Sequence, residues 1–177
     1  NIRPLNMLEE EDGVIRRLPL MFRSQDLQSG ERQELSMAME IAARMTGQAP
    51  VKGARGTIAF DGEELTFNGS GPLINFDGGE GWIPSYSLAD LHACALKGDK
   101  EFFRQHFAQK AVFLGAVLDV EDRKLTSRRF INTPDGARPP ARCVHSPMGG
   151  LYRTDVSRDS LPGVYLHASG VNMLLRK

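Results

Sequence analysis

The residues of this chain that could do chemistry are few, and the most suggestive of them follow two short apolar segments. His167 ends the run Leu161–His167, and Asp119 and Asp122 follow the run Lys110–Ala116. An imidazole at the edge of a sheet could bind an anion, and carboxylates there could hold a hard cation such as Mg²⁺ or Ca²⁺. The alternative for the imidazole is a helix cap or a bond to a backbone carbonyl. Two acids supply too few oxygens for a cation, so we expect no metal site.

Two neighbouring arginines, Arg16 and Arg17, form the other candidate binding group. A guanidinium matches two oxygens of a carboxylate or phosphate at once. The alternative is a solvated strand edge whose charges face the acidic segment Glu9–Asp12. The glycine-rich stretches Gly69–Gly71 and Gly78–Gly81 lack the Lys-Ser/Thr pair of a phosphate-binding loop, which favours turns. We expect no cofactor.

The cysteines and the remaining histidines do not form a catalytic arrangement. His92 and Cys94 are two residues apart, so on a helix they point to different faces. Cys94 is expected to be a small core residue. Cys143, near His145, could form a disulfide with Cys94 in an oxidising compartment, although the spacing does not establish that pairing.

The segments that would position these residues are typical of a mixed α/β domain. The runs Ala111–Leu114 and Leu161–His167 have the composition of strands buried on both faces, and the second leads into a helical pattern over Ser169–Leu175. We expect Val112 and Val164 to lie side by side at the centre of one layered sheet. Flanking helices and an antiparallel edge hairpin complete the predicted fold.

The first half of the chain predicts further elements of both kinds. Alternation over Val14–Arg23 indicates a strand, and apolar residues from Glu31 to Thr46 recur at helical spacing until Gly47 ends the helix. Two alternating segments, Thr57–Phe60 and Glu64–Phe67, flank Asp61-Gly62, the strongest hairpin signal of the chain.

The middle of the chain predicts a short strand, two helices and a loop. The strand is Leu73–Phe76, and Ser87 with Asp90 forms a capping-box pattern for a helix that buries Leu88, Leu91 and Ala95. A second helix covers Lys100–Phe107, with Phe103 and Phe107 as its buried pair. The interval from Asp119 to Ser160 has no sustained period and is expected to be a long loop.

Bulk composition bounds the classes of protein that fit. A chain of 177 residues, 41% hydrophobic, suits a single domain. Its 22 basic and 22 acidic residues cancel, so nucleic-acid binding is not expected. No apolar run approaches the roughly 18 residues needed to cross a bilayer, and the polar start is not a signal peptide. We expect the chain to be part of a longer polypeptide.

Several segments, in order and spacing, resemble the second type of CHASE sensor domain, the extracytoplasmic sensors of bacterial receptors. The string Pro-Gly-Val-x-x-His-Ala beginning at Pro162 is the most specific of them. The matching segments are Asp12–Leu20, Leu35–Ala43, Leu73–Phe76, Ser85–Leu91, Phe107–Ala116, Ser146–Gly150, Leu161–His167 and Leu174–Leu175. Asn75 lies in one of these segments and joins His167, Asp119, Arg16 and Arg17 as a candidate ligand-binding residue.

The chain departs from this family pattern in two places. Members of this kind carry more α/β sequence before Asp12, so the chain resembles the later part of the domain. Residues 120–145 resemble an insertion, which puts any ligand contact near that point in doubt.

The resemblance implies a sensor of a small-molecule or protein signal, located outside the cytoplasm and flanked by membrane helices in the full-length protein. It implies a cytoplasmic cyclase, kinase or similar output, no catalysis by this segment, and an association into homodimers. One alternative is a small hydrolase or transferase in which His167 is the base and Asp119 orients it, although no serine lies in a nucleophile elbow. Another is a dimerisation module anchored by Trp82.

Overall fold

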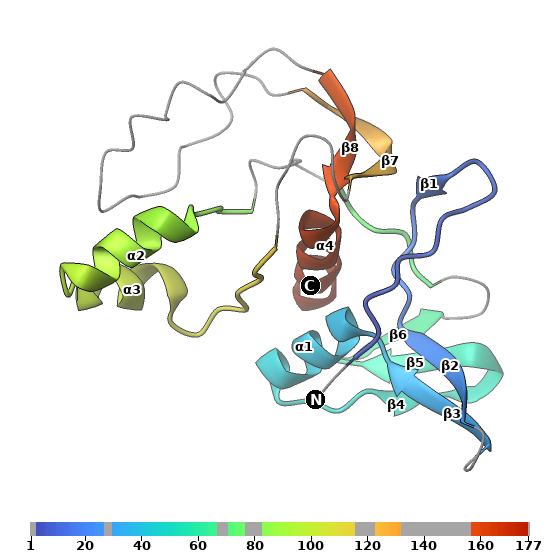
Figure 1. The fold of residues 1–177 in the computed structure, drawn as a ribbon. Coiled ribbons are helices and arrows are strands. Elements are labelled where there is room, and N and C mark those ends of the chain that lie inside the picture. The colour runs from blue at the N-terminus through green and yellow to red at the C-terminus, as the bar shows by residue number, and fades with distance from the viewer. Residues whose placement is uncertain are drawn as a thin grey trace.

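The computed structural model describes residues 3–26, 30–66, 71–76, 83–115, 123–131 and 157–176, which form a mixed α/β fold (Figure 1). The helices are α1 Met37–Thr46, α2 Leu88–Leu96, α3 Lys100–Phe107 and α4 Gly163–Leu175, with the 3-10 turn η1 Ala54–Gly56. The strands are β1 Val14–Ile15, β2 Met21–Asp26, β3 Gly30–Leu35, β4 Val51–Lys52, β5 Thr57–Phe60, β6 Glu63–Thr66, β7 Arg123–Ile131 and β8 Ser157–Pro162.

The strands form small sheets around α1 and α4. Strand β7 pairs in parallel with β1 and antiparallel with β8, so that sheet is mixed. Strands β2 and β3 form a hairpin, and β4, β5 and β6 form an antiparallel sheet. The expectation of one layered sheet built on two central strands is therefore wrong, although the mixed α/β class is confirmed.

The hairpin between β5 and β6 follows the predicted pattern. Phe60 pairs with Glu63 across Asp61-Gly62, whose φ angles are 49° and 88°. Both turn residues are left-handed, as a type I′ turn requires, and this is the turn whose twist matches the twist of the two strands.

Helix α1 ends where predicted but begins later. Gly47 closes it with φ 71°, and the hydroxyl of Ser36 accepts a hydrogen bond of 3.3 Å from the backbone nitrogen of Met39 at its start. The prediction placed Glu31–Leu35 in this helix, whereas these residues pair with β2 from Met21 onwards. The ladder with a neighbouring strand outweighs the local helical spacing in this segment.

The apolar run Leu161–His167 is mostly helical, which contradicts its prediction as a strand. Pro162 (φ −58°, ψ 144°) stands immediately before the helix, and α4 begins at Gly163. A residue before proline is held extended, so Leu161 remains in β8 while the chain turns helical directly afterwards. Helix α4 has buried residues on most of its circumference, and a short buried helix cannot be told from a buried strand by its periodicity.

The run Ala111–Leu114 is an irregular segment, so its prediction as a central strand is also wrong. Val112 is 63% exposed and Leu114 is 85% exposed, while Phe113 packs partly buried against the core. Gly115 lies against α4, since a Cβ at this glycine would stand 2.7 Å from the Cβ of Val164. The two apolar runs do meet, but not as paired strands.

The core joins α1 and α4 to the strands near the N-terminus. Its central members are side chains at most 1% exposed, among them Ile15, Leu18, Met39, Ile58 and Leu166. Figure 1 shows α4 between the β1–β7–β8 sheet and α1, with α2 and α3 set apart from the rest. Within the described part of the chain, no helix is long and apolar enough to span a membrane.

Three further expectations need correction. Leu73–Phe76 forms no strand beyond the isolated bridge between Arg17 and Leu73, although Ile74 and Phe76 are buried. Strand β7 lies inside the interval predicted as a loop. In α2, Leu88 is 67% exposed and Ala95 is also exposed, so part of the helix face that was predicted to be buried is exposed to solvent. The insertion at 120–145 remains a prediction.

Candidate ligand-binding site

Arg16 is held by two carboxylates of the preceding turn. Its Nη1 lies 3.0 Å from Oδ1 of Asp12 and its Nη2 lies 2.6 Å from Oδ2, a two-point contact. The same Nη1 donates to Oε2 of Glu10 at 2.7 Å. This guanidinium therefore already binds carboxylate oxygens in the geometry that an anionic ligand would use.

The acidic turn is closed by its own backbone as well. The backbone nitrogen of Gly13 donates to the carbonyl of Glu10 at 2.8 Å, and that of Val14 donates to Oδ1 of Asp12 at 3.1 Å. Hydrogen bonds from Arg16, and then from the backbone of Val14, lower the pKa of Asp12 from 3.8 to about 2. The hydrogen bonds from the two carboxylates raise the pKa of Arg16. The turn is a preformed ion-pair unit.

Arg17 contacts both this turn and the segment that begins at Gly71. Its Nη1 donates to the carbonyl oxygen of Gly71 at 3.0 Å, and its Nε lies 3.7 Å from Oε1 of Glu10. Gly71 has φ +88°, and a Cβ there would stand 1.9 Å from the carbonyl oxygen of Leu18. Only glycine suits this close approach of two backbones, so the contact of Arg17 is part of the packing.

Asn75 is brought near the arginines by backbone pairing. The nitrogen of Ile74 donates to the carbonyl of Arg16 at 2.7 Å, and the nitrogen of Leu18 donates to that of Pro72 at 2.9 Å. Asn75 is exposed and makes an interaction of its own. The structure thus places three of the predicted site residues, Arg16, Arg17 and Asn75, on two adjacent segments.

His167 lies on a different element from Arg16, Arg17 and Asn75. His167 is half-buried within α4 rather than at a strand end, and it has an interaction partner. Asp119, Asp122 and Trp82 lie outside the described residues, so the pairing of His167 with Asp119 remains a prediction. Among the described residues, no group of three or more His, Cys, Asp or Glu side chains could hold a metal ion.

The ion pairs continue from the acidic turn to the mixed sheet. Nζ of Lys124 lies 2.8 Å from Oε1 of Glu9, which joins the turn to β7. Arg123 donates from Nε to Oγ of Ser160 at 3.1 Å, which ties β7 to β8. The turn and the sheet that leads into α4 are therefore linked by polar contacts.

An aromatic cluster formed by Tyr86 and the side chains of α3 was missed apart from Phe103 and Phe107. The hydroxyl of Tyr86 lies 3.1 Å from Nδ1 of His106, and its ring centroid lies 4.9 Å from that of Phe107 and 6.1 Å from that of Phe102. Burial raises the pKa of Tyr86. The signal was present, because aromatic residues one turn apart on α3 predict a stripe on one helix face. Tyr86 precedes α2, and nothing local indicates that it completes the stripe.

Cys94 is buried in α2, as predicted for a small core residue, and it is disulfide-bonded, which the sequence analysis had left open. The other cysteine of the chain, Cys143, lies outside the described residues. Disulfides persist in oxidising compartments such as the periplasm and the cell exterior. This bond agrees with a location outside the cytoplasm.

The fold is of mixed α/β class, and its acidic turn is joined by ion pairs to Arg16, Arg17 and Lys124. The chain belongs to the CHASE2 domain family, whose model matches residues 1–177. The resemblance seen in the sequence is therefore confirmed, and the chain is an extracytoplasmic sensor domain. Comparisons with curated proteins and with solved structures found no match.

Proposed function

We propose that this chain senses a small-molecule or protein signal for a membrane-anchored receptor and passes it to a cytoplasmic cyclase, kinase or similar output. The match to the CHASE2 family over the whole chain carries this proposal. The segment itself performs no catalysis in this proposal. In support, Arg16 and Arg17 are engaged by protein groups rather than arranged around a reacting atom.

The ligand contacts that we propose lie at the acidic turn and on the two adjacent segments that carry Arg16, Arg17 and Asn75. An anionic ligand there would compete with Glu10 and Asp12 for the guanidinium groups. Such an exchange of partners would open a closed turn, so binding and conformational change would be one event. His167 and Asp119 remain candidates for a second contact.

The mechanism that we propose is a shift between two arrangements of the chain. A signal changes the populations only by the difference between its affinities for the two states. Helix α4 suits the role of the responding element, because it packs against α1 and lies next to Leu18, two residues after Arg16. A change at the turn therefore has a short path to α4.

Topology of the full-length protein tests this proposal directly. Two reporters are fused to the full-length protein, one active only outside the cytoplasm and one active only inside it. Each reporter is placed next to this segment and, in a separate fusion, beyond the membrane helix expected to follow it. The sensor hypothesis predicts that the outside reporter is active next to this segment and that the inside reporter is active beyond that helix. An inside location for this segment would overturn the proposal.

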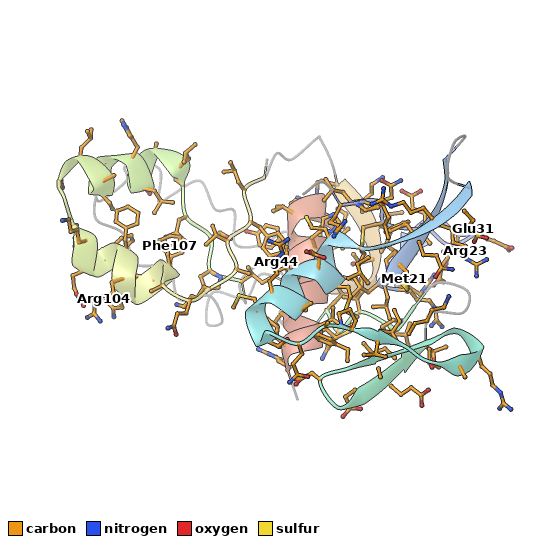
Figure 2. The ribbon with its side chains drawn as sticks, turned by 90° about the horizontal axis from the view of Figure 1, so that it is seen from below. Met21, Arg23, Glu31, Arg44, Arg104 and Phe107 are labelled. Atoms are coloured by element: carbon orange, nitrogen blue, oxygen red, sulfur yellow. The ribbon has the colours of Figure 1, made fainter. Side chains whose placement is uncertain are left out.

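The contribution of the turn is tested in the full-length receptor by Arg17→Gln, with Arg104→Gln as the matched control. Arg104 is an exposed arginine that pairs with Glu101 on α3 at 2.6 Å, and Figure 2 shows it pointing outwards. Altered output with Arg17→Gln alone supports a signalling role for the turn. Equal output from both variants and the wild type would contradict a signalling role for the turn.

A further inference from the structure

Two neighbouring residues, Ser85 and Tyr86, connect two parts of the molecule. Ser85 contacts α4 through its hydroxyl, and Tyr86 contacts α3 through its ring and its hydroxyl. We call α2 and α3 the helical arm and residues 83–87 the linker. Figure 1 shows the arm set to one side of α4, and the linker is the segment through which the chain enters the arm.

The contact with α4 is a hydrogen bond between two hydroxyl groups. The hydroxyl of Ser85 lies within hydrogen-bond distance of the hydroxyl of Tyr165, and also 3.1 Å from the carbonyl oxygen of Ile83. Tyr165 is 7% exposed and belongs to the same buried cluster as Leu166. Breaking this hydrogen bond between Ser85 and a largely buried tyrosine costs free energy, so α4 favours the linker position that keeps it.

The contact with the arm is aromatic. The ring of Tyr86 lies 4.9 Å from Phe107, 5.9 Å from His106 and 6.1 Å from Phe102, and its hydroxyl bonds to Nδ1 of His106. These residues come from the face of α3 that carries its aromatic side chains. A tilt or rotation of α3 would therefore carry Tyr86 with it.

The peptide bond between the two residues makes these contacts interdependent. Tyr86 cannot follow a movement of the arm without displacing Ser85, and Ser85 cannot shift without straining its bond to Tyr165. We propose that Ser85-Tyr86 couples the arm to α4, so that a signal acting on the arm changes the order of α4. This inference rests on the proposed sensory function and adds the route by which the domain responds.

Hydrogen exchange of the 177-residue chain, kept oxidised so that the disulfide of Cys94 is constant, tests the coupling. Phe107→Ala removes the ring closest to Tyr86. The coupling predicts about three- to tenfold faster exchange of the α4 amides near Tyr165, the effect of losing roughly one hydrogen bond. In a Tyr165→Phe background, the same arm substitution should leave the exchange of α4 unchanged.

Phe103→Ala is the matched control, because Phe103 is also a half-buried aromatic residue of α3. Its ring contacts are to Phe102 at 5.6 Å and Phe107 at 5.8 Å rather than to Tyr86. We expect a clearly smaller change in α4. Equal acceleration by both variants, or none by either, would overturn the inference.

A milder variant decides the question if Phe107→Ala unfolds the arm. Tyr86→Phe removes only the hydroxyl that bonds to His106 and leaves the ring in place. Faster exchange in both α3 and α4 supports the coupling, and a change confined to α3 refutes it. These readouts do not depend on membrane topology, so a failed topology test of the proposed function would leave them interpretable.

Discussion

Gly170 in α4 offers a sharp test of how tightly this helix is packed. The glycine is buried and faces Leu18, which is itself only 1% exposed. A Cβ placed on Gly170 would stand 2.5 Å from Cδ1 and 3.3 Å from Cδ2 of Leu18. The first distance is shorter than van der Waals contact, so Gly170→Ala forces one of the two side chains to move.

Two effects of opposite sign then compete. Replacing glycine by alanine inside a helix stabilises it by about 1 kcal/mol. Overpacking a buried site costs about 1–3 kcal/mol, and a fully buried leucine has little room to adjust. We expect the clash to dominate, with a net loss of about 1 kcal/mol in the free energy of unfolding.

Urea denaturation of the wild type, Gly170→Ala, Leu18→Ala and the double variant measures this competition. Leu18→Ala alone should cost about 2–5 kcal/mol through the cavity that it leaves. The new methyl group fills part of that cavity, so the double variant should lose less than the sum of the two single variants. A stabilised Gly170→Ala protein, or additive losses, would refute the close contact between α4 and Leu18.

Three further predictions use the same urea assay. Asp12 has a pKa of about 2 in the folded chain against 3.8 normally, so its stabilising effect is complete above about pH 4 and is lost as the pH falls towards 2. The stability gap between the wild type and Asp12→Asn should close over that range, and a gap that widens would contradict the sign. Phe113→Ala should cost about 1–2 kcal/mol, less than a fully buried ring, while Val112→Ala costs below about 0.5 kcal/mol. Equal losses would mean that this segment is buried on both faces after all. Ser36→Ala should cost about 1 kcal/mol through the lost cap of α1, and Ser36→Thr should recover most of it; no loss would show that the cap contributes nothing.

Local signals predicted the elements whose cause is local. The Asp61-Gly62 turn, the end of α1 at Gly47 and the bounds of α3 follow from backbone preferences and helix caps within a few residues. At the start of α3, the side chain of Asp99 accepts a hydrogen bond of 3.0 Å from the nitrogen of Phe102. These features need no partner from elsewhere in the chain.

The apolar runs were misread because an apolar composition fixes neither the backbone geometry of a short segment nor its burial. Leu161–His167 is mostly buried, as expected, yet most of it is helical because Pro162 separates the strand from α4. Ala111–Leu114 has the composition of a strand but remains irregular, with Val112 largely exposed. Short apolar runs carry no period long enough to separate these outcomes.

In the candidate site too, some residues were predicted from the sequence and others were found only in the structure. The sequence pointed to Arg16 and Arg17 and to the acidic segment that could face them, and the structure pairs both arginines with Glu10. The sequence did not point to Tyr86 or Tyr165 as contact residues. Their partners, His106 and Ser85, lie 20 and 80 residues away in the chain.

The sequence by itself determined the family, through the order and spacing of segments along the whole chain, and the mixed α/β class. It also determined the turns and caps, because these depend on residues close together in the chain. Only the tertiary structure decided that Gly71 lies against Leu18 and that Ser85 reaches Tyr165. The physical reason is that hydrogen bonds between distant segments form only when the whole core brings them together. No local preference of either partner contains that information.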